Sequence, residues 1–340
     1  GSTGAPKWVV FDAKKLSENA DGVRDRMKIS RRDCVLVSTP LAHLFGLGGG
    51  LLPALLAGAS LRVTKGGDPL SILKAERESD PTVAFLIPSQ CMALLPLRRS
   101  VRQYRVVVVG VGRLSQDFAA AFEAMNGTVA GMYGSTELGA VVGAHPQADP
   151  ERRRQYIGPA MKSARVFVEA DQTDGSGRAI GPVYVEHEAG YLGYADASGN
   201  LIAPAPDRQP MGDLGTVNAH GDLDIVGRVD DRVRRDGFWV LTHDIETCLS
   251  DAEGVAEAAV ISTGTTRRGA GIIAYVILQP KGSTNADNLL QICRKNLPGH
   301  MVPDEVLELQ SFKRLASGKI DLRALTEHAE ARLRGIENSK

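Results

Sequence analysis

Short β-branched runs that alternate with helical stretches restrict the fold of this 340-residue chain more than any other feature. Runs of strand length occur at Val35–Ser38, Ser60–Thr64, Val83–Ile87, Arg105–Val109 and Thr128–Met132. Helical stretches lie between them, among them Pro53–Gly58 and Gln116–Met125. Because parallel strands need crossover connections, which are usually helices, this alternation predicts a mainly parallel sheet flanked by helices.

The pattern changes after Gly181. Shorter strands such as Val183–Glu188 and Leu223–Val226 alternate there with Gly, Asn and Asp turns, which predicts a smaller, more antiparallel subdomain. A charge cluster, GRVDDRVRRDG at Gly227–Gly237, separates this subdomain from a final unit. We place a domain boundary inside the cluster, near Asp230.

The final unit has the pattern of a small α+β domain. Its predicted elements are a helix at Asp244–Ser250, strands at Ala258–Ser262 and Gly271–Leu278, a helix ending near Leu297 with Thr284 and Asp287 as its capping box, a further strand, and a C-terminal helix capped by Asp321. We therefore expect an α/β plus α+β chain. An incomplete large domain, with mainly parallel sheets and a small β-subdomain, covers residues 1–229, and a small, mobile α+β lid domain covers residues 230–335.

The charge balance limits the classes of partner. Forty basic residues balance forty acidic ones, so no overall charge points to nucleic acid or to an anionic membrane. A small neutral or anionic ligand fits better. Because the first residues are polar and are followed by Lys7, we expect no signal peptide. The uncharged run from Leu44 to Leu61 contains several glycines and Pro53, which favour a buried loop and core helix over a membrane span.

The cysteines indicate the compartment. They are Cys34, Cys91, Cys248 and Cys293. Their spacing matches no metal site, and we expect isolated core thiols. Such thiols are typical of a reducing compartment, so the prediction is a cytoplasmic protein.

The chain opens with GSTGAPKW. The glycines let backbone amides converge, Ser2 and Thr3 add hydroxyl groups, and Lys7 adds a positive charge, a combination that can hold a polyphosphate. The spacing is not that of the Walker P-loop, in which the lysine is followed by Ser or Thr. A flexible N-terminal tag explains the same residues equally well.

Three later motifs carry polar groups at predicted turns. MYGSTELG, at Met132–Gly139, offers an aromatic ring for stacking and oxygens for phosphate or metal. MGDLG, at Met211–Gly215, contains an aspartate that can accept both hydroxyls of a ribose. LASGKIDLRAL, at Leu315–Leu325, has a tight turn that projects Lys319. Each motif alone is also typical of an ordinary solvated turn.

The order of the motifs carries more information than any one of them. STGAPK, PLAHLFGL, YGSTE, GD, GRVDD, GFWV with DIE, and SGKIDLRAL together resemble the adenylate-forming superfamily, which comprises acyl-CoA synthetases, peptide-synthetase adenylation domains and firefly-type luciferases. The resemblance runs from the first residue to about Leu325. Enzymes of this family use ATP to activate a carboxylate as an acyl-adenylate and then pass the acyl group to a thiol. The resemblance implies ATP, Mg²⁺ and coenzyme A, or the phosphopantetheine of a carrier protein, as cofactors.

The resemblance also implies a set of cofactor-binding residues. They are Ser2, Thr3, Gly4, Lys7, Tyr133, Gly134, Asp213, Arg228 and Gly237. The first four would embrace the β- and γ-phosphates, and Tyr133 would stack beside adenine. Asp213 would bind the ribose hydroxyls with Arg228 close by, and Gly237 would line a pantetheine tunnel.

The candidate catalytic residues implied by the same resemblance are Lys319, Thr136, Glu137 and His43. Lys319 would reach both the substrate carboxylate and the α-phosphate. Thr136 would touch the α-phosphate, and Glu137 would be the metal ligand for Mg²⁺. His43 resembles a gate between the acyl pocket and the thiol channel, although a hydrogen-bonded core histidine is an open alternative. Asp230 would be the hinge about which the lid domain rotates.

The acid pocket is expected to have an aliphatic wall. Its residues would be Leu44–Gly48, Val109–Gly112, Gly131–Met132 and Val141–Val142. None of them is a charged partner for an ammonium group, which favours an aryl or fatty acid over an amino acid.

The sequence departs from the family pattern in two respects. The family's usual stretch before the phosphate loop is missing, which would leave sheet edges and apolar surface uncovered. We therefore expect a truncated form, a proteolytic product or one half of a split enzyme whose N-terminal segment is a separate chain, and weak or no activity of this chain alone. Met211 replaces a threonine, and Asp236 and Trp239 replace basic residues, which weakens the expectation for the thiol step more than for adenylation.

The expected function is an ATP-dependent acid:thiol ligase, acting on a small aryl or fatty acid with coenzyme A as the acceptor. One alternative is a ligase that loads a separate acyl carrier protein. An alternative of another class is an inactive module that binds nucleotide or a partner chain. The presence of Glu137, Asp213 and Lys319 together favours an enzyme.

Overall fold

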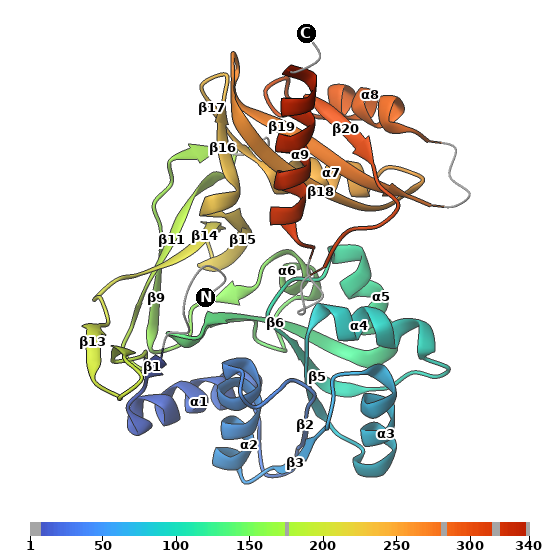
Figure 1. Cartoon of the computed structure of the whole chain (residues 1–340). Helices are drawn as coiled ribbons and strands as arrows, with labels where there is room; N and C mark the ends of the chain where they lie inside the picture. The colour runs from blue at the N-terminus through green and yellow to red at the C-terminus, as the bar shows by residue number, and fades with distance from the viewer. Residues whose placement is uncertain (1–7, 174–176, 280–283, 315–319, 338–340) are drawn as a thin grey trace. The chain divides into compact units, whose positions relative to one another are not determined.

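The computed structural model describes residues 8–173, 177–279, 284–314 and 320–337 (Figure 1). The chain divides into two compact units, residues 1–225 and 226–340. The boundary predicted near Asp230 lies a few residues beyond this division, and the functional domain limits stay a prediction.

A six-stranded sheet organises the first unit. Its strands are β2 (Cys34–Val37), β3 (Ser60–Val63), β4 (Val83–Leu86), β5 (Tyr104–Val109), β6 (Gly127–Ser135) and β7 (Gly139–Gly143), in the order β3-β2-β4-β5-β6-β7. Neighbouring strands from β3 to β6 are parallel, whereas β7 returns antiparallel to β6. The predicted, mainly parallel sheet is confirmed.

Helices cover both faces of this sheet (Figure 1). One face packs against α1 (Ala13–Met27) and α2 (Leu52–Ala57), and the other against α3 (Pro69–Ser79), α4 (Pro88–Leu94) and α5 (Gln116–Asn126). The π-helix η1 (Phe45–Leu51), the short 3₁₀-helix η2 (Leu95–Leu97) and α6 (Pro150–Gln155) complete the helices described in this unit. The sheet has a hydrophobic core on each face, and successive residues of a strand point into different cores. Val83 and Phe85 of β4 lie in the core beside α1 and α2, and Ala84 and Leu86 lie in the core beside α3, α4 and α5. A sheet covered on both faces requires such continuous apolar runs.

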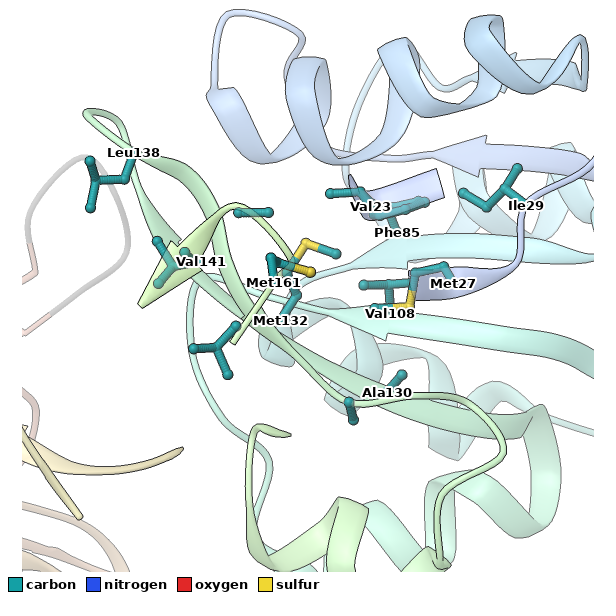
Figure 2. Packing of buried hydrophobic residues seen from close by; sticks show 14 of the residues in the cluster. Val23, Met27, Ile29, Phe85, Val108, Ala130, Met132, Leu138, Val141 and Met161 are labelled. Carbon is teal, nitrogen blue, oxygen red and sulfur yellow. The ribbon is translucent and has the colours of Figure 1, made fainter. Parts of the chain in front are cut away.

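The core beside α1 and α2 extends to the end of β6. Figure 2 shows Val23 and Met27 of α1 pointing toward Phe85 and Val108 of the sheet. Met132 of β6 belongs to the same cluster and is 7% exposed. The strand that carries MYGSTELG is therefore anchored in the core just before the motif's polar residues.

The remainder of the first unit is antiparallel, as predicted. A second six-stranded sheet contains β8 (Gly158–Pro159), β9 (Ala164–Val168), β10 (Gln172–Thr173), β11 (Ala179–His187), β14 (Gln209–Val217) and β15 (Asp222–Arg228). A three-stranded sheet contains β1 (Trp8–Val10), β12 (Gly193–Ala195) and β13 (Leu201–Pro204). β15 continues into the second unit at its last residues.

The second unit is a five-stranded sheet with helices on both faces. Its elements are the 3₁₀-helix η3 (Val229–Asp231), β16 (Arg232–Arg235), β17 (Phe238–Leu241), α7 (Thr242–Ser250), β18 (Val255–Thr266), β19 (Gly269–Leu278), α8 (Ala286–Asn296), β20 (Glu305–Glu308) and α9 (Leu322–Glu337). β19 alternates between two cores: Ile272 and Ala274 pack with α7 and α8, and Ile273 and Tyr275 pack with α9. The predicted α+β character of this unit is confirmed.

Three local expectations need correction. The charge cluster is not only a separator, because Arg232–Arg235 forms β16 and Arg235 is fully buried in an ion pair with Asp304. Thr284 does not cap α8, because the cap is Asn285, whose side chain accepts the Asn288 N–H at 2.9 Å. Asp321 does cap the last helix and accepts the Ala324 N–H at 3.1 Å.

The third correction concerns two of the cysteines, which are not isolated. Cys248 of α7 and Cys293 of α8 are hydrogen-bonded to each other. Burial raises the pKa of Cys293 to about 12. Both thiols are free, and their contact joins two helices that sequence spacing does not connect.

No helix among the described residues is long and apolar enough to cross a membrane. The run that begins at Leu44 forms the π-helix η1, where a buried loop was predicted, and then the helix α2, which was predicted.

Candidate functional site

A tight turn between β6 and β7 carries the polar residues of MYGSTELG. Gly134 lies so close to the returning strand that a Cβ there would be 1.8 Å from the Gly139 carbonyl oxygen. Gly139 has φ +68°, and a Cβ there would be 2.5 Å from Asn19 Oδ1. Only glycine fits both positions, so the backbone of this turn is determined by its sequence.

A buried asparagine on α1 holds the same turn. Asn19 is 3% exposed, and its amide group donates to the carbonyl oxygens of Leu138 at 2.9 Å and Ala140 at 3.3 Å. Its Oδ1 accepts the Ala140 N–H at 3.1 Å. His187 of β11 lies beside it, with Nε2 3.1 Å from the Ala140 carbonyl oxygen, and burial lowers the pKa of His187. Asn19 and His187 were not predicted, because their contacts are with residues remote in sequence.

Glu137, the predicted metal ligand, lies half-buried in the turn. Its Oε1 accepts the Tyr194 hydroxyl of β12 at 2.8 Å, and its carbonyl oxygen accepts the Tyr191 N–H at 2.9 Å. The rings of Tyr191 and Tyr194 pack edge to face with centroids 5.3 Å apart. Burial raises the pKa of Tyr194, so its hydroxyl stays protonated and donates to the carboxylate. Neither tyrosine was predicted.

Tyr133 and Asp213 come together although 80 residues separate them. The Tyr133 hydroxyl donates to Asp213 Oδ2 at 2.6 Å. Asp213 lies on β14 and is 8% exposed. The residues predicted for adenine and for ribose are thus neighbours, and Tyr133 lies on β6, the strand that leads into the turn with Thr136 and Glu137. Thr136 itself is exposed.

His43 precedes the π-helix η1 and is exposed, so the alternative interpretation as a core histidine is wrong. Its Nδ1 accepts the Phe45 N–H at 3.2 Å. The Phe45 ring lies against Gly110, where a Cβ would be 2.4 Å from the ring. It packs edge to face on the Phe85 ring, with the two ring centroids 5.7 Å apart. Next to Gly110, the β-branched Val111 has φ +65°. For a β-branched residue such a backbone conformation costs roughly 1–3 kcal/mol, and strained residues of this kind cluster at functional sites.

Part of the predicted acid-pocket wall is wrong. Val141 and Val142 have no accessible surface and pack in the core around Met132, so they line no pocket. The other wall segments, Leu44–Gly48, Val109–Gly112 and Gly131–Met132, contain residues with accessible surface. They stay a prediction.

Several predicted site residues lie outside the described part of the first unit. Ser2, Thr3, Gly4, Lys7 and Lys319 lie outside the described residues. Arg228, Asp230 and Gly237 belong to the second unit, and their roles stay predictions.

Asp236 and Trp239, the two residues near Gly237 that depart from the family pattern, contact other residues of the second unit. Asp236 and Gly237 both have positive φ, +51° and +84°, in the turn between β16 and β17. The hydrogen bond from Arg268 to Asp236, at 2.6 Å, lowers the pKa of that carboxyl. Arg232 stacks over the Trp239 ring with its guanidinium carbon 4.2 Å from the centroid. Both unusual residues therefore stabilise the hairpin itself.

The described residues of the site can bind a metal ion only if a bound ligand supplies further coordinating atoms. No group of three or more His, Cys, Asp or Glu side chains within the described ranges is arranged to bind an ion. Mg²⁺ is usually bound by one or two carboxylates and substrate phosphates, and not by an all-protein cage. Glu137, a single half-buried carboxylate at an exposed turn, fits that mode.

Solved structures share this fold. ATP-bound MatB from Rhodopseudomonas palustris superposes with a TM-score of 0.82 at 24% identity, covering 96% of this chain and 66% of that one. O-succinylbenzoate coenzyme A synthetase from Bacillus subtilis, in complex with AMP, superposes with a TM-score of 0.80 at 21% identity, covering 94% and 66%.

Sequence comparison finds relatives over nearly the whole chain. The 2-succinylbenzoate–CoA ligase of Enterococcus faecalis is 26% identical over 339 residues, covering 97% of this chain and 69% of the relative. The indoleacetate–CoA ligase of Aromatoleum aromaticum is 25% identical, covering 94% and 64%. One of the plipastatin synthase subunits of Bacillus subtilis is 24% identical, covering 96% of this chain and 13% of the relative. The chain spans about two thirds of the length of the CoA ligases.

Family models account for most of the chain. The AMP-binding enzyme family matches residues 1–195, and the AMP-binding enzyme C-terminal domain matches residues 244–319. The first match begins at the predicted phosphate loop and contains the whole β6–β7 turn. The chain therefore belongs to the AMP-binding enzyme family.

Proposed function

We propose that this chain carries the nucleotide site of an ATP- and Mg²⁺-dependent ligase, which activates a carboxylic acid as an acyl-adenylate and transfers the acyl group to coenzyme A. The observation that carries this proposal is the hydrogen bond of 2.6 Å between Tyr133, on the strand that leads to Glu137, and Asp213 of β14. An aromatic ring and a carboxylate suited to a metal lie on one strand and the turn that follows it, and a buried carboxylate of β14 accepts the hydrogen bond of the ring's hydroxyl. Such a set suits a nucleoside triphosphate bound with its metal.

Each group of the site has a chemical task in this scheme. The Asp213 carboxylate accepts hydrogen bonds from ribose hydroxyls while Tyr133 donates to its Oδ2. Thr136 donates its hydroxyl to the α-phosphate, and Glu137 is the ligand for Mg²⁺. When bound, Mg²⁺ neutralises phosphate charge and orients the polyphosphate. Lys319 stabilises the negative charge that develops on the α-phosphate during attack by the carboxylate.

The remaining predicted residues serve substrate delivery. Ser2, Thr3, Gly4 and Lys7 hold the β- and γ-phosphates. Gly134 keeps the backbone close beside adenine, and Arg228 assists Asp213. His43 gates the acid pocket, Gly237 lines the thiol channel, and Asp230 is the hinge of the lid. The acid is an aryl or fatty acid, and the four free cysteines fit a cytoplasmic protein.

A carrier protein is the second candidate for the acceptor. Plipastatin synthase subunits, which are similar to this chain over most of its length, favour it. Thioester formation with coenzyme A and with a phosphopantetheine-bearing carrier protein, each measured by mass spectrometry, separates the two. Product with coenzyme A alone supports the proposal, and product with the carrier alone replaces it.

Hydroxylamine-trapped, acid-dependent pyrophosphate release, measured on this chain and on a form extended at its N-terminus, tests the activation step. The substrates are a panel of aryl, fatty and amino acids, and the control variant is Lys319→Ala, which we expect to lower the rate by a factor of about 10²–10³. Release with aryl or fatty acids that collapses in the variant supports the proposal. ATP binding without acid-dependent release in any condition favours the non-catalytic nucleotide-binding module.

A further inference from the structure

Glu137 accepts a hydrogen bond from a tyrosine 57 residues further along the chain. The Tyr194 hydroxyl donates to Oε1 at 2.8 Å. A bond to one carboxylate oxygen restricts the rotation of the carboxylate plane, and with it the direction of Oε2. A free glutamate side chain at an exposed turn would otherwise sample several rotamers.

Tyr194 is itself held in place by its surroundings. It lies on β12, which pairs with both β1 and β13. Its ring packs edge to face on Tyr191, whose hydroxyl donates to Gln209 Oε1 at 2.8 Å and whose N–H donates to the Glu137 carbonyl oxygen at 2.9 Å. The donor that reaches Glu137 therefore comes from a fixed sheet and not from a mobile side chain.

We propose that Tyr194 is a positioning residue for Glu137, holding the carboxylate so that Oε2 is directed to the metal of a bound metal–nucleotide complex. This inference rests on the proposed function. A single protein carboxylate shares the metal with phosphates and waters in that scheme, so the orientation of this one ligand matters more than it would in a site with several. Hydrogen-bond partners of metal ligands typically contribute 10–100-fold to metal affinity.

The test is Tyr194→Phe, which removes the hydroxyl and keeps the ring packing on Tyr191. Mn²⁺ is the spectroscopic probe, and electron paramagnetic resonance measures its binding in the presence of saturating ATP. We expect the Mn²⁺ dissociation constant to rise about 10-fold or more. ATP affinity measured in a metal chelator is expected to stay at the wild-type value, because Tyr194 acts through the metal ligand only.

Tyr191→Phe is the matched control. It removes a neighbouring hydroxyl, which bonds Gln209 and the Tyr194 side chain, but keeps both the N–H that bonds the Glu137 carbonyl oxygen and the direct bond from Tyr194 to Glu137. Its Mn²⁺ affinity is expected to stay near that of the wild type. Equal Mn²⁺ affinity in wild type and Tyr194→Phe would overturn the inference, as would an equal loss in both variants.

Ligand-free crystal structures of wild type and Tyr194→Phe provide a readout that does not depend on nucleotide binding. The inference predicts one Glu137 rotamer in the wild type and several in the variant. If the wild type binds neither ATP nor Mn²⁺, the proposed function fails, and the rotamer comparison still decides whether Tyr194 positions Glu137. One unchanged rotamer in both structures would contradict it.

Discussion

Replacing Asn19 by alanine removes the side chain that ties α1 to the β6–β7 turn. Asn19 makes hydrogen bonds of 2.9, 3.3 and 3.1 Å to the backbone of Leu138 and Ala140. The turn would then carry a buried carbonyl at Leu138 and a buried N–H at Ala140 without these partners. An unpaired buried group costs about 1–3 kcal/mol, so we expect the free energy of unfolding of the first unit to fall by roughly 2–6 kcal/mol.

The same change should loosen the nucleotide site, because the turn that carries Thr136 and Glu137 loses its anchor. Urea unfolding followed by circular dichroism measures the stability, and calorimetric titration with ATP and Mg²⁺ measures the affinity. Asn200→Ala is the matched control, since Asn200 caps an exposed turn through Asp196. Asn19→Ala with the stability and the nucleotide affinity of that control would refute the assignment of Asn19 as the anchor.

Three further predictions concern other parts of the molecule. Asp304→Asn leaves the fully buried Arg235 guanidinium without its counter-charge, so the free energy of unfolding of the second unit, measured with urea, should fall by about 3 kcal/mol or more. Arg235→Met leaves only the half-exposed Asp304 carboxylate without a partner, so it should lower this free energy by less. A larger loss in Arg235→Met than in Asp304→Asn would contradict this account. Tyr133→Phe removes the donor to Asp213 Oδ2 and should weaken ATP binding in calorimetry while reducing the preference for ATP over 2′-deoxy-ATP; an unchanged preference would mean that Tyr133 does not orient the carboxylate. Burial lowers the pKa of His187 below about 6.5, the value of a histidine in the unfolded chain. As the pH falls below about 6.5, the unfolded chain therefore binds a proton before the folded one does, and the stability contributed by neutral His187 should be lost. His187→Gln should reduce this dependence of the free energy of unfolding on pH.

Short-range signals predicted the sheet and the turn. The β-branched runs predicted the parallel strands because a strand that is buried on both faces consists of apolar residues throughout, as Val83–Leu86 does. The polar residues of MYGSTELG predicted a turn after the strand, and the structure adds that close backbone approach excludes a Cβ at Gly134. These features depend on residues that are neighbours in sequence.

Long-range partners could not be predicted in the same way. Asn19, Tyr194 and His187 act through contacts with residues far along the chain, and their own neighbourhoods look like an ordinary helix and ordinary strands. Arg235 was grouped with the charge cluster that separates the two parts of the chain, because its burial depends on Asp304, which lies in a different segment. Val141 and Val142 looked like pocket residues because the sequence does not show which apolar side chains reach the core.

The most direct test of the central claim is a calorimetric titration of ATP with Mg²⁺ into the wild-type chain, Asp213→Asn and Glu137→Gln. The account predicts binding by the wild type, an affinity at least about 10-fold lower in Asp213→Asn because a hydrogen bond to a charged group is lost, and a loss in Glu137→Gln that appears only when Mg²⁺ is present. Wild-type binding that neither substitution changes, or no binding at all, would contradict the assignment of the β6–β7 turn as the nucleotide site.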